Sequence, residues 1–305
     1  MPAGPEDGAG AGAGAGAGDG DGDGVAAVVV DYNVGPLLLD CVVSLRADGV
    51  RSIIVVENGA PGSSSAALGA LAAEVTIIAT GANLGFGAGV NRGVAACDPN
   101  VELIVVANPD SVVHPGALRA LQAGLDEHPT WAMVGPTIVT AEGERYPSVR
   151  RFPSFLDAVG HALLGQIAPA NRFTTRYRSA SIGPDGGVDW VSGAFFVIRR
   201  DAFEEVGGFD EAYFMFAEDM DLCWRLRQAG RGVGVATAAV VTHVEGVARR
   251  PHPYRMLVAH HRSALRFANE TTSGPARALL PLAALVLGVR LAGSILQMAL
   301  RARRA

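Results

Sequence analysis

The stretch VAAVVVDYN, residues 25–33, decides the fold because six apolar residues in a row end in three polar ones. An apolar run without alternation indicates a strand that is buried on both faces, as in parallel sheets. Further runs of this kind occur at residues 52–56 (SIIVV), 75–79 (VTIIA), 103–106 (LIVV) and 133–139 (MVGPTIV). We therefore predict that these segments are strands of one sheet.

Predicted helices separate these strands, at about residues 36–47, 87–96 and 115–127. Strands that alternate with helices through short connections indicate an α/β fold with a mostly parallel sheet. In such sheets ligands bind beyond the carboxyl ends of the strands, so we expect the functional site there.

The second half of the chain is more mixed. We expect a continuous strand at residues 188–198, a short helix at 203–206 and a longer helix at 219–229. Residues 232–242 favour an edge strand. Two further helices are predicted, one at about residues 253–269 and one from residue 275 to about 300.

The chain is expected to have three parts. Residues 1–24 are mostly Gly, Ala and Asp, which have nothing to bury, and we expect a disordered leader without the features of a signal peptide. Residues 25–248 lack a Pro- or Ser-rich linker and are predicted to form one domain. Residues 249–305 are predicted to be a basic, helical tail that associates with a membrane.

The charge distribution sets this tail apart. From residue 249 onward there are ten arginines and a single acid, a net charge of +9, whereas the whole chain carries −5. A basic tail on an acidic body predicts an anionic surface as its partner. The basic residues are not interleaved with aromatic ones, so we favour a membrane surface over nucleic acid.

The last predicted helix could meet a membrane in two ways. Residues 279–300 are apolar except for Arg290, Ser294 and Gln297, and at ~1.5 Å per residue they could just cross a ~30 Å hydrocarbon core. Arg290 would then lie at mid-depth, at a cost of roughly 2.5–3.5 kcal/mol. We therefore favour a helix lying in the interface; a single span and an ordinary buried helix stay open.

The three cysteines are widely spaced and form no CxxC pair, so neither a zinc site nor a disulfide framework is predicted. A reducing compartment fits this pattern. With the basic tail, we expect peripheral attachment to the cytoplasmic face of the cell membrane.

Polar residues follow several predicted strands. Asp31, Tyr32 and Asn33 follow the first strand, and Glu57 ends the second, where it could accept a pyrimidine N–H or lie in a surface turn. Asn108-Pro109-Asp110 follows the fourth. A carboxylate there can hold a divalent cation that bridges two phosphates, although Asn-Pro-Asp is also a good turn sequence. His243, which ends the last predicted strand, could join such a site or be structural.

The glycine-rich stretch TGANLGFGAGVNRG, residues 80–93, does not fit a dinucleotide-binding fingerprint. Three residues after the second glycine the chain has Val90 or Arg92 instead of glycine, and the stretch follows the third strand rather than the first. The glycines still allow a ligand to approach the backbone closely. Asn83 and Asn91 could donate hydrogen bonds to it, and Arg92 could face a diphosphate or solvent.

Three acids crowd the stretch FAEDMDLCWR, residues 216–225. Acids at a helix start gain roughly 0.3–1 kcal/mol each from the helix dipole, and Asp221 can pair with Arg225 one turn later. Clustered carboxylates also raise one another's pKa, which is a way to tune a general base. Both readings apply to Glu218 and Asp219.

Together these motifs resemble the family-2 inverting glycosyltransferases of the GT-A fold, a Rossmann-like sheet flanked by helices. The match covers roughly residues 25–270 and runs through VVVDYN, VVEN, NLGFGAGVNRG, NPD, WVSGAFFVIRR, GGFDEAYFMFAEDMDLCWRLRQAG and VTH. Within that family, residues 144–155 and 161–178 are similar to actinobacterial rhamnosyltransferases that act on N-acetylglucosaminyl-diphospho-polyprenol.

The resemblance implies a role for each matching position. Asp219 matches the catalytic base, with Glu218 beside it, and Asp110 and His243 match a site for Mg²⁺ or Mn²⁺. Glu57 stands where such enzymes usually have an aspartate, and Asn108 where their acidic motif begins. The implied nucleotide-sugar contacts are Tyr32, Asn33, Glu57, Asn83, Gly85, Asn91, Arg92 and Asn108. The positions implied for donor sugar and acceptor are Trp190, Ser192 and Gly193.

The implied reaction is an inverting displacement in cell-wall polysaccharide assembly, from dTDP-L-rhamnose to a lipid-linked GlcNAc. Galactofuranosyl or hexosyl transfer from a UDP-sugar on the same fold is the main alternative. A sugar-nucleotide pyrophosphorylase is less favoured, because residues 31–35 after the first strand contain no basic residue. The sequence leaves the donor sugar, the choice of metal and any homo-oligomeric state open.

Overall fold

The computed structural model describes residues 24–165, 167–179, 182–244 and 253–302. All but the last residue of the predicted leader lies outside the described residues, and so does the predicted domain boundary at residue 248.

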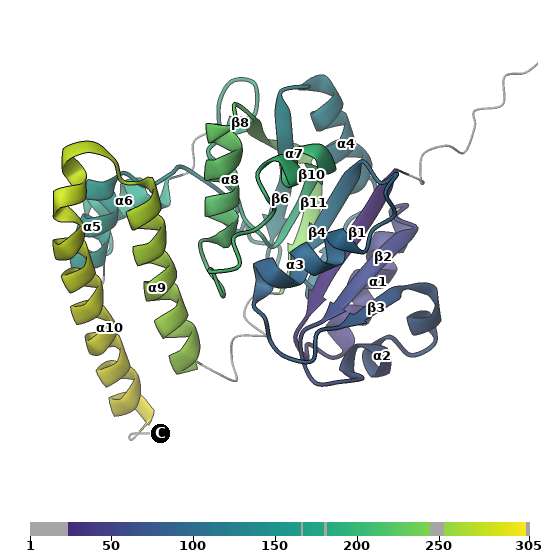
Figure 1. Cartoon of the computed structure of the whole chain (residues 1–305), viewed down its shortest axis with the longest axis horizontal. Helices are drawn as coiled ribbons and strands as arrows, with labels where there is room; N and C mark the ends of the chain where they lie inside the picture. Colours follow the sequence, from purple (N-terminus) through teal and green to yellow (C-terminus); the bar gives the residue numbers. More distant parts are fainter. Residues whose placement is uncertain (1–23, 166, 180–181, 245–252, 303–305) are drawn as a thin grey trace, which may run out of the picture.

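A nine-stranded, twisted sheet runs through the molecule in the order β3-β2-β1-β4-β10-β6-β11-β5, with β8 also paired to β11 (Figure 1). β1 to β4 are parallel to one another, and β11 is parallel to β6, whereas β10 runs antiparallel to both of its neighbours. The predicted mostly parallel sheet is therefore confirmed. The strands are β1 (Val25–Asp31), β2 (Ser52–Glu57), β3 (Thr76–Ala79), β4 (Leu103–Ala107), β5 (Ser111–Val113), β6 (Trp131–Val139), β8 (Gly187–Val188), β10 (Phe195–Arg199) and β11 (Gly232–His243).

Helices cover both faces of the sheet and divide the core into two layers. Along β1, alternate residues face opposite layers, so Ala27 and Val29 pack on one side and Val28 and Val30 on the other. This explains why the run at residues 25–30 shows no alternation. One layer contains α1 (Pro36–Ala47), α2 (Ser63–Leu68) and α4 (Ala117–Glu127), and the other contains α3 (Phe86–Ala95), α7 (Arg200–Glu205) and α8 (Glu218–Gln228).

Two strand predictions are wrong. The expected strand at residues 188–198 is three pieces: β8, β9 (Trp190–Val191) and β10, and β9 pairs with β7 (Val149–Arg150) in a separate two-stranded sheet. Between β9 and β10, residues 192–194 do not pair with a neighbouring strand. Their backbone groups instead form hydrogen bonds with Ser148, Asp219 and Asn108. Residues 232–242 do not form an edge strand, because the three-residue β5 covers the far side of β11.

Four helices form a flank beside α8: α5 (Phe155–Leu164), α6 (Arg172–Arg178), α9 (Pro253–Thr271) and α10 (Leu280–Ala302) (Figure 1). The last two were predicted, although the second begins with a 3₁₀ turn at Gly274–Leu279, whereas α5 and α6 were not. The flank is joined to the sheet domain by α9. Tyr213 Oη donates to Glu270 at 2.6 Å, and Ser263 Oγ donates to Met215 O at 2.8 Å.

Helix α10 is not an ordinary buried helix. The segment Gly274–Leu300 is long and apolar enough to cross a membrane, with a mean hydropathy of 2.1, and only 6% of the window is buried. It packs against α9 and α5 on one side and leaves large apolar side chains exposed on the other.

Candidate active site

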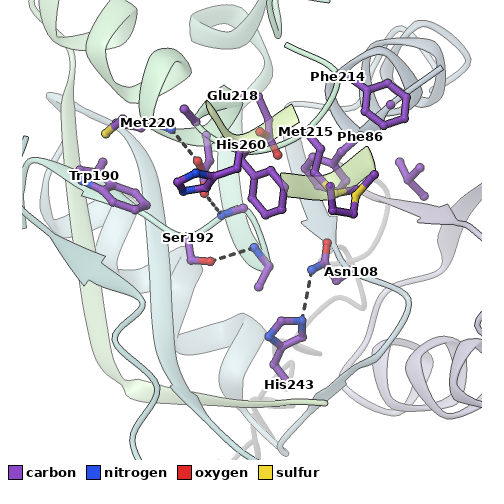
Figure 2. A pocket seen from close by; sticks show the side chains of 18 of the residues that line it. Phe86, Asn108, Trp190, Ser192, Phe214, Met215, Glu218, Met220, His243 and His260 are labelled. Atoms are coloured by element: carbon purple, nitrogen blue, oxygen red, sulfur yellow. Dashed lines mark hydrogen bonds between the residues drawn. The ribbon is translucent and has the colours of Figure 1, made fainter. Parts of the chain in front are cut away.

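A cavity of about 440 Å³ opens beyond the carboxyl ends of the strands and below the start of α8 (Figure 2). Helix α9 forms part of its wall. Most of the site residues expected from the sequence come together here. Those that line the cavity are Tyr32, Asn83, Gly85, Asn108, Asp110, Trp190, Ser192, Gly193, Glu218, Asp219 and His243.

The loop before α3 is held in place by Asn58, which is 2% exposed. Its Nδ2 donates to Gly85 O at 2.9 Å, and its Oδ1 accepts the Leu84 N–H at 3.1 Å. Gly85 has φ +93°, and a Cβ there would meet the carbonyl oxygen of Phe214, which accepts the Phe86 N–H at 3.2 Å. Glycine thus allows the loop to close against the segment that precedes α8.

Four predicted nucleotide contacts do not line this cavity. Glu57 is buried, and its two oxygens accept the N–H groups of Gly62 and Ser64, both at 2.9 Å, at the start of α2. Asn33 Oδ1 accepts the Ala60 N–H at 2.8 Å. Asn91 exchanges hydrogen bonds with the backbone of Phe209, and Arg92 is exposed on α3. Each of the first three side chains therefore supports a loop or helix.

Asp110 and His243 meet at one side of the cavity because β5 pairs with the end of β11. Asp110 Oδ1 lies 3.2 Å from His243 Nε2, and Asn108 Nδ2 lies 3.2 Å from the same nitrogen (Figure 2). Asp110 and His243 are 6% and 7% exposed, so water reaches them only through the cavity.

This arrangement fits a divalent cation that is shared with a ligand. A carboxylate and an imidazole are suitable donors, and the buried His243 Nδ1 has no hydrogen-bond partner among the described residues. No group of three or more His, Cys, Asp or Glu side chains in the described ranges is arranged so that it could hold a metal ion by itself. The protein would therefore supply two such ligands, and a bound diphosphate and water would supply the rest.

Asp219 lines the cavity from the first turn of α8. Its Oδ2 accepts the Gly193 N–H at 2.8 Å, and its Oδ1 accepts the Met220 N–H at 2.8 Å. A Cβ on residue 193 would come within 3.3 Å of the Asp219 Cβ, so glycine lets the two segments meet. The carboxylate is thus fixed in orientation while its remaining lone pairs face the cavity.

Glu218 and Asp219 differ in how readily their carboxyl groups ionise. Burial raises the pKa of both carboxyls, and the two backbone N–H groups and Arg150 oppose that rise at Asp219. Glu218 Oε2 is buried with no partner among the described residues. Burial first, and the charge of Asp219 second, raise the pKa of Glu218 to about 8. The hydrogen bonds and the nearby arginine therefore favour ionisation of Asp219 over that of Glu218.

The turn before α8 sets the orientation of Glu218 and Asp219. Phe216 and Ala217 have φ of 68° and 63°, the left-handed region that residues other than glycine rarely adopt. Asp221 points away, and its Oδ2 lies 2.7 Å from Arg225 Nη2. Arg225 also donates to the carbonyls of residues 206 and 208. The predicted supporting role of Asp221 is confirmed.

Several cavity residues were missed in the sequence. They include Tyr146, Arg150, Arg151, Tyr177, Arg255 and His260. The doubled arginine in SVRRF was a visible signal, but its strand of two residues was too short to predict. Arg255 and His260 come from α9, and no local pattern places that helix beside the cavity.

Solved structures show what fold this is. A mannosyltransferase from Pyrobaculum calidifontis, PcManGT, determined with GDP-Man and Mn²⁺, matches 90% of the chain and 76% of its own length, with a TM-score of 0.56 and 16% identity. GalNAc-T7, determined with UDP, GalNAc and Mn²⁺, matches 82% of the chain and 48% of its own length, with a TM-score of 0.58 and 13% identity. The fold is therefore that of the GT-A glycosyltransferases.

Sequence comparison narrows this class. The family described as glycosyltransferase like family 2 matches residues 22–262, and the chain belongs to this family of enzymes. The N-acetylglucosaminyl-diphospho-decaprenol L-rhamnosyltransferase of Mycobacterium tuberculosis is 37% identical over 259 residues, 81% of this chain and 84% of its own length. A pre-mycofactocin glycosyltransferase of the same organism is 33% identical over 66% of the chain and 38% of its own length.

Proposed function

We propose that this glycosyltransferase moves L-rhamnose from dTDP-L-rhamnose to a GlcNAc-diphospho-polyprenol acceptor, with inversion at the anomeric carbon. The observation that carries the proposal is the Asp219 carboxyl group, held by the Gly193 N–H in the cavity that also contains the Asp110–His243 pair. The extended similarity to the mycobacterial rhamnosyltransferase supports the choice of sugar and acceptor.

Asp219 acts as the general base. Its free lone pairs accept the proton of the acceptor hydroxyl while that oxygen forms a bond to the anomeric carbon and the bond to the nucleotide diphosphate breaks. Glu218, protonated beside it, keeps the negative charge of the pair on the residue that takes the proton. Trp190, Ser192 and Gly193 position the sugars around this carboxylate.

The diphosphate of the donor is placed against Asp110 and His243. Asp110 and His243 would hold Mg²⁺ or Mn²⁺ there, and the cation would stabilise the leaving diphosphate electrostatically. Asn108 orients His243 through the contact at 3.2 Å. Tyr32 and the loop of Asn83 and Gly85 contact the nucleotide end.

The acceptor is anchored in a membrane, and we place the enzyme on that surface. The exposed apolar face of α10 and the basic charge of the tail suit an anionic interface on the cytoplasmic side.

The test is an assay with the purified full chain, dTDP-L-rhamnose and GlcNAc-diphospho-polyprenol, before and after metal removal. We expect a product heavier by one rhamnose, inverted at the anomeric carbon, and activity that is lost with chelation and returns with Mn²⁺ or Mg²⁺. Efficient transfer from UDP-galactofuranose with none from dTDP-rhamnose would contradict the donor assignment. Asp110→Ala should weaken the response to added metal, and an unchanged metal dependence would contradict the cation site.

A further inference from the structure

Two neighbouring arginines line the cavity, and neither has yet been given a ligand. Arg150 ends β7 and Arg151 follows it. Arg150 Nε donates to Pro147 O at 3.1 Å, and its guanidinium lies 5.5 Å from the centre of the Trp190 ring. These contacts hold the side chain while its terminal nitrogens have no further hydrogen bond to a described residue.

Neither guanidinium group forms an ion pair with a carboxylate among the described residues, although the charge of Arg150 favours the ionised form of Asp219. Asp189, which precedes Trp190, the strand partner of Arg150, is already occupied: its Oδ1 lies 3.0 Å from Arg227 Nη1, and its Oδ2 accepts the Phe152 N–H at 2.8 Å. Two adjacent positive charges that face a cavity in this way suit an anionic ligand.

The two arginines lie apart from Asp110 and His243, where we place the donor diphosphate. The chain from Tyr146 to Arg150 passes along the cavity: the Tyr146 ring lies 5.9 Å from that of His243, Ser148 O accepts the Ser192 N–H at 2.8 Å, and Arg150 pairs with Trp190. Figure 2 shows Trp190 on one side of the cavity and His243 on the other. Arg150, which lies over the Trp190 ring, is therefore on the Trp190 side of the cavity rather than beside His243.

Apolar surface begins just beyond the arginines. Helix α5 starts four residues after Arg151, and it exposes Leu156 (68%) and Leu163 (53%). Helix α10 packs against α5 and extends this surface. A long ligand with one end at Asp219 could thus contact Arg150 and Arg151 first, and then the apolar surface of α5 and α10.

We propose that Arg150 and Arg151 bind the diphosphate of the lipid-linked acceptor, with the sugar directed to Asp219 and the polyprenyl chain to α5 and α10. The proposal rests on the proposed function, which supplies an acceptor of this chemistry. A diphosphate diester carries two negative charges, one for each arginine. The acceptor would thereby be distinguished from an uncharged glycoside of the same sugar.

The experiment measures binding without any donor, so it does not depend on which sugar is transferred. Isothermal titration of the full chain in detergent would compare a citronellyl GlcNAc diphosphate with citronellyl GlcNAc, which lacks the diphosphate. We expect the wild type to prefer the diphosphate, and Arg151→Gln and Arg150→Gln each to weaken its binding about tenfold, the loss typical of a charge-assisted contact. Binding of the uncharged glycoside and of dTDP should change less than threefold.

Two control variants sharpen the comparison. Arg262→Gln removes an exposed arginine of α9 that does not line the cavity. Arg255→Gln removes a charge from the same cavity, but Arg255 lies over the Phe214 ring at 4.6 Å, beside the loop of Gly85. Both should leave binding of the diphosphate ligand within threefold, and thermal melting would verify that all variants fold.

The inference is overturned if the wild type does not prefer the diphosphate, if Arg255→Gln is as harmful as the other two, or if the losses appear in dTDP binding instead. A clear preference that both arginine variants abolish supports it, even where no rhamnose is transferred. In that case the donor assignment alone would fail, so the two failures are distinguishable.

Discussion

Asp219 and Glu218 are adjacent in the chain, yet their surroundings favour ionisation of Asp219 over that of Glu218. Asp219 accepts two backbone N–H bonds, whereas Glu218 Oε2 is buried without a partner among the described residues. A general base has to be ionised at the working pH, so the geometry favours Asp219. Because burial also raises the pKa of Asp219, the acid limb of the pH–rate profile should lie above the usual range of an aspartate.

The first prediction concerns this base. Asp219→Asn should lower kcat by about 10²–10⁴-fold, the usual contribution of a general base, and leave dTDP binding nearly unchanged. Steady-state kinetics with calorimetric binding would check it. Asp221→Asn in the same cluster should instead reduce stability, because it breaks the contact to Arg225. Near-normal turnover by Asp219→Asn with intact binding would exclude it as the base.

The second prediction concerns the proton on Glu218. Its pKa is about 8 in the fold, against 4.5 for the ordinary side chain. Between these values the unfolded chain has released the proton and the folded chain retains it, so raising the pH favours unfolding. Glu218→Gln removes this effect. The variant should gain stability relative to the wild type as pH rises from about 4.5 to about 8, and urea unfolding at pH 5, 7 and 8 would measure it. Parallel stability curves would contradict the assignment.

At the scale of elements, two loops close against each other at Gly85 and Phe214. The Phe86 N–H donates to Phe214 O, and only a residue without Cβ fits between them. The same segment then turns through Phe216 and Ala217 in the left-handed region and begins α8. This contact therefore links the loop at the nucleotide end to the segment that leads into the acids at the start of α8.

The third prediction tests that contact. Gly85→Ala should destabilise the protein by about 2 kcal/mol or more, from left-handed backbone strain and the collision with Phe214, and should raise the KM for the donor. Gly81→Ala is the matched control, because Gly81 has φ +74° but open space at its Cβ. It should cost about 1 kcal/mol and leave the donor KM unchanged. Equal behaviour of both variants in thermal melting and kinetics would show that the contact does not matter.

At the scale of the whole molecule, the helical flank joins the cavity to an apolar surface. Helix α9 contributes Arg255, Met256 and His260 to the cavity wall and is fastened to the sheet domain through Tyr213 and Asp210. On its outer side α10 exposes a row of large apolar side chains. One rigid element thus connects the active site to the proposed membrane surface.

The fourth prediction tests this surface. Leu282, Leu285 and Leu296 are 54%, 63% and 60% exposed on α10. Replacing all three by Ser should weaken binding to anionic vesicles at least tenfold, because burial of apolar area is worth about 25 cal/mol per Å². Sedimentation with vesicles would measure it, and Val43→Ser, 48% exposed on α1, is the control. Unchanged vesicle binding would exclude α10 as the contact. Resistance of the wild type to high-salt and carbonate extraction would indicate a span.

Local sequence patterns determined the strands of this protein and one edge of its candidate site. Apolar runs specified the strands, since burial on both faces requires them, and parallel pairing then brought Tyr32, Asn108 and Asp110 to one edge. Tertiary contacts decided the rest. Glu57 is bound by the start of α2, β7 pairs with β9 to place Arg150, and α9 closes the cavity through a bond between Tyr213 and Glu270. These contacts join segments far apart in the chain, so no local periodicity or motif carries them, and only the packed fold could show them.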